Sequence, residues 1–246
     1  MRYFLEVAYR GTGFAGFQVQ ENARTIQGEV EAALQTIFRD RLSLTGSSRT
    51  DAGVHALQNF FHVDTEAELQ ARHIYNVNAL LPGGIALKSI RKVAADAHCR
   101  FDATSREYRY HICRGKDPFL EDRAWHFPYT VDFELLTKAA RLIIPQADFS
   151  AFAKRNTQVK TFLCKVVTSE WLEVGGGLVY RVESNRFLRG MVRALVATML
   201  RVGRGTMTLD EFSGVLEGGD NRAADFSAPP HGLFLHRVNF PPTYFL

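Results

Sequence analysis

One aspartate, Asp51, lies in the stretch of this sequence best suited to chemistry. Its neighbours are Arg49-Thr50-Asp51-Ala52-Gly53-Val54-His55-Ala56, so an arginine stands two residues before it and a histidine four residues after it. The preceding Gly-Ser-Ser at 46–48 is typical of a tight loop. A carboxylate held among cations and backbone donors stays ionised and can act as a nucleophile or a base. The alternative is that Asp51 only closes a turn, as Asp and Gly two residues apart often do.

Three other kinds of site are disfavoured. The segment 11–16, Gly-Thr-Gly-Phe-Ala-Gly, matches the dinucleotide pattern G-x-G-x-x-G, but no helical periodicity begins at its third glycine. An RRM-type aromatic motif also fails there, because Thr12 occupies a position that requires an aromatic residue. No serine or cysteine has a nucleophile-elbow setting. The eight histidines show no metal-ligand spacing, so we expect no bound metal.

The composition predicts a folded protein with a phosphate-bearing partner. With 246 residues, 46% of them hydrophobic, the chain can bury one large core or two small ones. The net charge of +4 is unevenly placed, since residues 154–165 hold four basic residues and no acid. Clustered arginine favours a nucleic-acid partner, although a solvated basic face would show the same pattern. Six arginines against one acid occur in 181–204, namely Arg181, Arg186, Arg189, Arg193, Arg201 and Arg204.

Several features suggest a cytoplasmic protein. Glu6 interrupts an already short apolar run, so the first residues do not resemble a signal peptide. No uncharged apolar stretch approaches the length of a membrane span. The three cysteines, Cys99, Cys113 and Cys164, are far apart, which predicts reduced thiols rather than a disulfide framework.

The elements that must position Asp51 follow from apolar periodicity. Residues 2–9 alternate as a strand, and residues 26–38 have helical spacing with Thr25 as N-cap. The Asp51 loop is expected between short strands at 42–45 and 57–63. A weaker helix at 69–80 and a strand at 85–94 complete the first half.

The second half repeats this order. We expect a strand at 107–113, a helix near 132–143, strands at 159–173 and 178–185 joined through Gly175-Gly176-Gly177, a helix at 188–200 and a last strand near 233–240. Each half is therefore β-α-β-β-α-β, as in ferredoxin-like folds. The predicted fold class is α+β. Residues 1–103 and 104–246 form two halves of one mostly antiparallel sheet, with helices on one face and an RNA-binding cleft.

The Asp51 stretch resembles the signature of the tRNA pseudouridine synthase A (TruA) family. Other segments resemble family blocks in the same order over nearly the whole chain: 9–12, 16–18, 78–82, 101–104, 108–110, 148–152, 187–193 and 228–233. The sequence departs from the family pattern in having Arg10 for an acid, Phe17 for tryptophan, Ser48 for glycine and Arg186 for a small residue. None of these departures removes a group that the chemistry needs.

The resemblance implies an isomerase that converts uridine to pseudouridine at positions 38, 39 and 40 of the tRNA anticodon stem-loop. It implies no cofactor, a flipped-out target base and a homodimer. Asp51 carries over as the catalytic carboxylate, whether it attacks C1′ or C6 or removes a ribose proton, and Arg193 carries over as its ion-pair partner. Tyr108 carries over as the aromatic that stacks on the base, and Arg49 as the occupant of the vacated space. The structural alternatives are strand packing for Tyr108 and an ordinary surface position for Arg193.

Two rival functions remain open from the sequence. A non-catalytic RNA-binding protein with two RRM-like halves would explain the arginines and aromatics but not the Arg-Thr-Asp loop. A glycosidic hydrolase that uses Asp51 as nucleophile would release free uracil. It would usually have a second catalytic carboxylate, for which the sequence offers no candidate.

Overall fold

The computed structural model describes residues 1–154, 159–242 and 244–245. These residues divide into two compact units. The first unit comprises Met1–Thr104 with Phe234–Leu246, and the second comprises Ser105–Leu233. The first boundary lies one residue from the expected one.

The sheet of the first unit places β3, the strand that follows the Asp51 loop, beside β1. The strand order is β4-β1-β3, with antiparallel pairing throughout. Two further strands pair with β3. Strand β2 pairs antiparallel with β3 at Phe61 and His62, and β9 pairs parallel with β3 at His55 and Ala56. The strands are β1 (Arg2–Tyr9), β2 (Thr45–Gly46), β3 (His55–Asp64), β4 (Ile85–Val93) and β9 (Leu233–Asn239).

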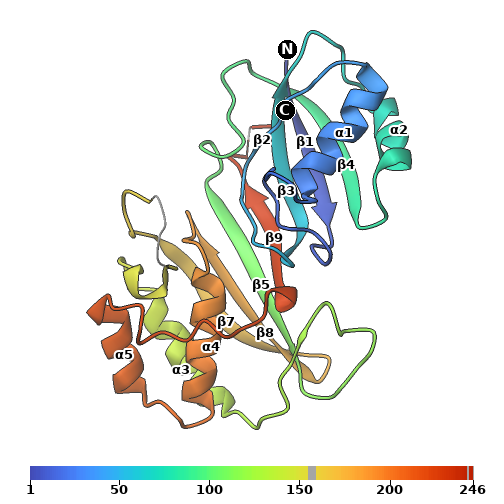
Figure 1. Ribbon diagram of the computed structural model, residues 1–246. Coiled ribbons are helices and arrows are strands. Elements are labelled where there is room, and N and C mark those ends of the chain that lie inside the picture. The colour runs from blue at the N-terminus through green and yellow to red at the C-terminus, as the bar shows by residue number, and fades with distance from the viewer. Residues whose placement is uncertain (155–158, 243, 246) are drawn as a thin grey trace. The chain divides into compact units, whose positions relative to one another are not determined.

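Two helices, α1 (Ile26–Phe38) and α2 (Arg72–Leu80), lie on one face of this sheet (Figure 1). Helix α1 begins where expected, because the Thr25 side chain accepts a hydrogen bond from the Gly28 backbone N–H at 3.2 Å. Its apolar face buries Val30 and Leu34 completely.

The opposite face of the same sheet is covered by the chain's C-terminal aromatic residues. Phe4 points away from the helices yet is 1% exposed. The rings of Phe240, Tyr244 and Phe245 lie 5.7, 5.7 and 6.0 Å from it. The tail therefore buries an aromatic residue that strand alternation alone would leave in solvent.

In the second unit, β8 is the middle strand and pairs antiparallel with β5 and with β7. Gly175 and Gly176 have positive φ angles of 57° and 78° and turn the chain from β7 into β8, as expected. The elements are β5 (Ser105–Cys113), β6 (Trp125–His126), α3 (Phe133–Ile143), a 3-10 turn (Ser150–Phe152), β7 (Val166–Val174), β8 (Gly177–Ser184), α4 (Met191–Gly203), α5 (Leu209–Gly218) and a second 3-10 turn (Pro230–Gly232).

Helix α4 is the core of the second unit and packs against α3 and α5. All but two of its residues are buried, the exceptions being Arg193 and Arg201. Its apolar residues are therefore sequestered from water on nearly every side. No helix in the described ranges combines the length and the apolar character needed to cross a membrane.

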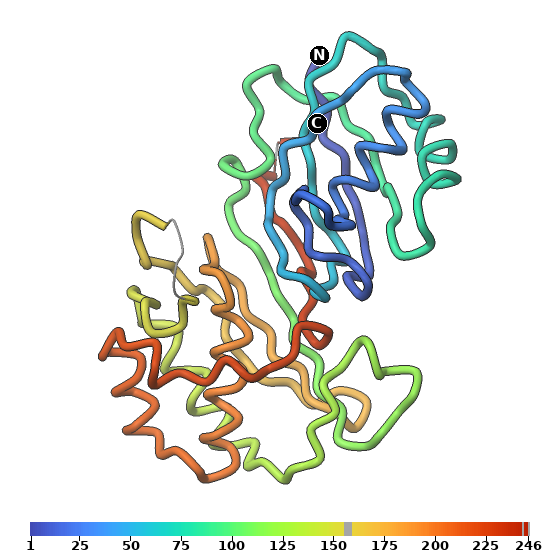
Figure 2. The backbone as a smooth tube through the Cα atoms, viewed as in Figure 1, coloured from blue at the N-terminus to red at the C-terminus, as the bar shows by residue number. Residues whose placement is uncertain are grey.

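The α+β class and the mostly antiparallel pairing are confirmed. Three local expectations need correction. The last strand, expected within the second half, groups with the first unit because it pairs with the start of β3, and Figure 2 traces it in red beside the cyan β3. The strand expected at 159–173 begins at Val166, because Leu163 instead bridges Asp148. Helix α5 was not expected at all.

Candidate active site

Asp51 lies in a tight turn that leads directly into β3. The turn is closed by the backbone, because the Val54 N–H donates to the Asp51 carbonyl at 3.1 Å, and Gly53 adopts a φ of 78°. The Asp51 side chain is half-buried. The main chain thus supplies a hydrogen bond that closes the bend.

The glycine-rich segment 11–16 supports this turn at close range. A Cβ atom on Gly11 would lie 2.1 Å from the Val54 carbonyl oxygen. Gly16 has a φ of 103°, and a Cβ atom there would lie 3.0 Å from the Thr50 carbonyl oxygen. These glycines let two backbones meet, which explains the G-x-G-x-x-G pattern without a nucleotide.

Buried polar groups hold the residues just before Asp51. The Tyr9 hydroxyl lies 2.7 Å from Thr50 Oγ1. Asn59 Nδ2 donates to the Tyr9 hydroxyl at 3.2 Å and to the Ser48 carbonyl at 2.8 Å. The Phe17 backbone N–H donates to the Thr50 carbonyl at 3.1 Å. Sequence reasoning missed both residues, because Tyr9 is 41 residues from Thr50 and no local pattern marks the contact of Asn59 with Ser48, 11 residues away.

Arg49 and His55, the two residues expected to place positive charge near Asp51, differ in exposure and in charge. Arg49 is exposed. His55 is 1% exposed, its Nδ1 accepts a hydrogen bond from the Gly11 N–H at 3.1 Å, and its ring stacks on Phe234 with centroids 4.5 Å apart. An imidazole nitrogen that accepts a hydrogen bond carries no proton, so His55 is a neutral supporting group rather than a cation.

Tyr108 and Arg193 belong to the second unit. Tyr108 lies on β5 opposite Val182, is 8% exposed, and meets the Phe187 ring edge-on with centroids 5.0 Å apart. Arg193 is half-buried in the first turn of α4. Its Nε donates to the Ala228 carbonyl at 2.6 Å, which fixes the plane of the guanidinium. The pKa of the nearby Tyr110 is raised by burial, an effect that the charge of Arg193 partly opposes.

The basic stretches differ in how much of their charge is exposed. Arg189, Arg204, Lys160 and Lys165 are exposed, whereas Arg155 lies outside the described residues. Arg181 is paired with the buried Glu107 at 3.2 Å and with Glu170 at 3.0 Å. Burial acts to raise the pKa of Glu107, but hydrogen bonds from Arg109 and Arg181 outweigh it and lower that pKa. The charge of Arg181 is therefore already compensated within the sheet.

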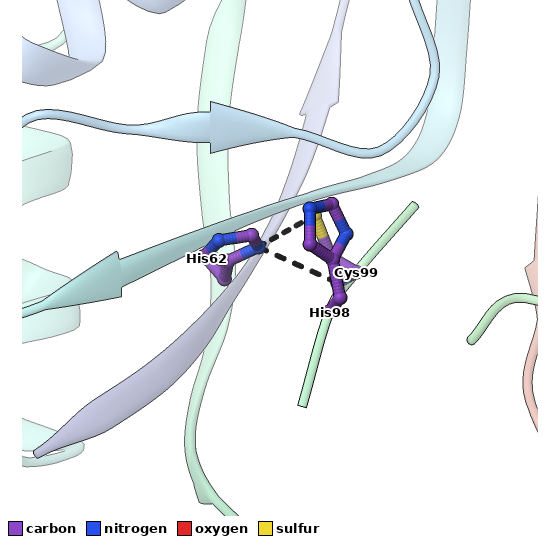
Figure 3. Close-up of side chains that lie close together, drawn as sticks. All are labelled: His62, His98 and Cys99. Carbon is purple, nitrogen blue, oxygen red and sulfur yellow. Dashed lines mark hydrogen bonds between the residues drawn. The ribbon is translucent and has the colours of Figure 1, made fainter. Parts of the chain in front are cut away.

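A second polar cluster lies on β3 and the segment after β4. His62, His98 and Cys99 present ligand-type atoms within 4.8 Å of one another (Figure 3), although the sequence shows no metal-ligand spacing. His62 Nδ1 lies 3.3 Å from the Cys99 sulfur. Burial lowers the pKa of His62 to about 4, and His98 and Arg2 contribute to this shift.

The protonation pattern of this cluster disfavours a metal. The backbone N–H groups of Arg100 and Phe101 donate to His98 Nδ1 at 3.1 and 3.4 Å, which places the proton of a neutral His98 on Nε2. An imidazole that binds a metal through one nitrogen donates a hydrogen bond through the other, whereas Nδ1 of His98 accepts hydrogen bonds. The cluster instead links β3 to the tail, because Asp102 accepts hydrogen bonds from the His98 N–H and the Tyr244 hydroxyl.

Comparison with known proteins gives independent evidence of the family to which the chain belongs. The family model described as tRNA pseudouridine synthase matches residues 6–102 and 139–241. A tRNA pseudouridine synthase A from Parabacteroides distasonis is 40% identical over 99% of this chain and 98% of its own length. Proteins of the same name from Porphyromonas gingivalis and Bacteroides thetaiotaomicron are also 40% identical, over 100% and 99% of this chain and 99% and 92% of their own lengths. With a matched model over both units and relatives of full length, the chain belongs to the tRNA pseudouridine synthase family.

Proposed function

We propose that this chain isomerises uridine to pseudouridine at positions 38, 39 and 40 of the tRNA anticodon stem-loop, with Asp51 as the catalytic carboxylate. The observation that carries the proposal is the placement of Asp51 in a family-matched segment, on a turn whose main chain is fixed by its neighbours. A positioned carboxylate is the group that the chemistry requires.

The reaction is an internal rearrangement that breaks the bond from N1 of uracil to C1′ of the ribose. The base rotates, C5 bonds to C1′, the C5 proton leaves and N1 gains a proton. Atoms and electrons balance without a redox cofactor. Because the target base is stacked in a stem, it must be flipped out, at a cost of roughly a few kcal/mol.

Arg193 is proposed as the ion-pair partner of Asp51. Its Nε is engaged by the Ala228 carbonyl, so end-on pairing with a carboxylate would use the two Nη groups. The fixed guanidinium would orient the carboxylate as well as stabilise its charge.

Tyr108 is proposed to stack on the flipped base, and Arg49 to enter the space that the base leaves. The rigid setting of Tyr108 against Phe187 supports a fixed platform, and the exposure of Arg49 supports insertion into RNA. The exposed basic residues Arg189, Arg204, Lys160 and Lys165 would contact phosphates, so binding should weaken steeply with salt.

We further propose that the chain acts in the cytoplasm as a homodimer with tRNA lying across both subunits. This assignment follows the family and is open to measurement by sedimentation of the free protein and of its tRNA complex.

The test is Asp51→Asn, assayed for both pseudouridine formation and tRNA binding. We expect no detectable isomerisation and tRNA affinity within about threefold of wild type, because the amide keeps the shape and loses the charge. Asp96→Asn, which changes an exposed carboxylate of the same unit, is the control and should behave as wild type. Turnover near wild type in Asp51→Asn would refute the catalytic role. Release of free uracil by wild type would favour a hydrolase, and tRNA binding without any isomerisation would favour a binding protein.

A further inference from the structure

We infer that Tyr9 and Asn59 are positioning residues for Asp51, and that they act through the hydroxyl of Thr50. This inference rests on the proposed role of Asp51 and extends it to side chains outside the Arg-Thr-Asp segment. All three residues are buried, with exposed fractions of 5%, 0% and 8% for Tyr9, Asn59 and Thr50.

The orientation of the Asn59 amide is fixed by its neighbours. Its Oδ1 accepts a hydrogen bond from the Phe60 N–H at 2.9 Å, so its NH₂ group faces the Tyr9 hydroxyl and the Ser48 carbonyl. One side chain therefore holds the loop backbone at Ser48 and the tyrosine hydroxyl at the same time.

A second hydrogen bond extends from the same tyrosine hydroxyl. The Tyr9 oxygen accepts from Asn59 Nδ2 and lies 2.7 Å from Thr50 Oγ1, so a hydrogen bond joins the two hydroxyls. A short bond in a buried site constrains both partners, because breaking it would leave two polar groups without solvent.

Thr50 passes this constraint to the catalytic residue. Its carbonyl accepts from the Phe17 N–H at 3.1 Å and abuts Gly16, so the peptide that enters Asp51 is held through both its side chain and its main chain. These contacts to Thr50 thereby set the direction of the Asp51 Cα–Cβ bond. A displacement of about 1 Å at a reacting group can cost on the order of a hundredfold in rate.

Removing the Tyr9 hydroxyl tests the inference with little change in packing. Tyr9→Phe keeps the ring beside Phe17, whose centroid lies 5.8 Å away, and removes the hydroxyl that contacts Thr50 and Asn59. We expect kcat to fall about tenfold to a hundredfold, with KM and tRNA affinity unchanged within about twofold. Tyr3→Phe is the matched control, because Tyr3 is also buried on β1 and, among the described residues, its hydroxyl is hydrogen-bonded to the Met1 sulfur alone.

A double-variant cycle separates positioning from general destabilisation. Thr50→Val removes the other hydroxyl of the same bond and should match the kcat of Tyr9→Phe, whereas Thr50→Ser should restore the wild-type value. The double variant Tyr9→Phe with Thr50→Val should be no slower than the slower single variant, because both changes remove one bond.

The inference is overturned if Tyr9→Phe keeps kcat within twofold of Tyr3→Phe, or if the two losses multiply in the double variant. Should Tyr9→Phe fail to fold, the Thr50→Val and Thr50→Ser pair decides in its place. Asp51→Asn keeps the two proposals distinct. An inactive Asp51→Asn with unaffected Tyr9→Phe removes only the positioning role, whereas an active Asp51→Asn removes the catalytic assignment itself.

Discussion

Phe17 stacks on Phe61 with ring centroids 4.5 Å apart and an angle of 8° between the rings, directly beneath the segment that leads to Asp51. Phe17 is 1% exposed and Phe61 is fully buried. Phe17 occupies the position where the family usually has tryptophan, and its ring fills the space between Phe61 and Gly46. The departure therefore changes the size of a buried side chain that supports the loop.

Gly46→Ala should destabilise the first unit through this ring. A Cβ atom at residue 46 would lie 2.3 Å from Phe17 Cε1, and Phe17 cannot retreat because Phe61 backs it. We expect a loss of about 1–3 kcal/mol in the free energy of unfolding, measured by denaturant titration. Gly83→Ala is the control, since a Cβ atom there meets nothing within 4 Å. Equal stability of the two variants would show that the ring can yield.

Arg193→Ala should lower both the stability of the second unit and the turnover. The change removes a charged donor from the buried Ala228 carbonyl, which is expected to cost about 1.5–3 kcal/mol. Turnover should fall at least about a hundredfold if Arg193 also orients Asp51. Arg141→Ala, which changes an exposed arginine in the last turn of α3, should alter neither the unfolding midpoint nor kcat. A silent Arg193→Ala would exclude both roles.

The sequence predicted the elements of the first half well, because their signals are local. Residues 2–9 alternate, Thr25 caps α1 at its first turn, and β4 ends within one residue of the expected position. The side chains that support the Asp51 loop were not predictable in this way. Tyr9 and Thr50 meet only because β1 and β3 pair in one register, with Tyr9 opposite Ala56, and pairing over 40 residues leaves no local trace.

The missed helix α5 shows the opposite case, since a local signal was present. Thr208 and Glu211 form a capping box, a pattern readable from spacing alone. Gly214 and Gly218 lower the helical propensity of 209–218, so the interior of this segment does not predict a helix. Helices with poor propensity are recoverable from their caps rather than from their interiors.

Thr208→Ala should therefore destabilise α5 measurably. The Glu211 N–H would lose its side-chain acceptor at 3.1 Å, for an expected cost of about 1 kcal/mol. The effect should appear as faster hydrogen exchange in 209–218 at unchanged kcat. Thr137→Ala is the matched control, because that hydroxyl lies inside α3 and bonds back to the Phe133 carbonyl. Identical exchange in both variants would mean that packing, rather than the cap, holds α5.

Mild acid should destabilise the first unit through His62. Burial lowers the folded-state pKa of His62 to about 4, whereas an unfolded histidine titrates near 6.5. Between these values the unfolded state binds more protons, so stability falls as the pH falls, by up to about 2 kcal/mol between pH 7 and pH 5. Burial lowers the pKa of His231 as well, so the second unit adds a slope of the same sign.

The His62 contribution can be isolated by comparing the urea unfolding of His62→Gln with that of wild type. Circular dichroism is the signal to monitor, because both tryptophans lie in the second unit and their fluorescence would not report on the first. His62→Gln should be the less pH-sensitive protein between pH 7 and pH 5, even if it is less stable overall. His126→Gln, which alters an exposed histidine, should keep the wild-type slope. The pKa values of Asp64, Asp102 and Glu107 are lowered from ordinary values that already lie below pH 5, so these three carboxylates add little to the slope in this window. Parallel slopes for His62→Gln and wild type would mean that the buried imidazole accepts a proton without disturbing the fold.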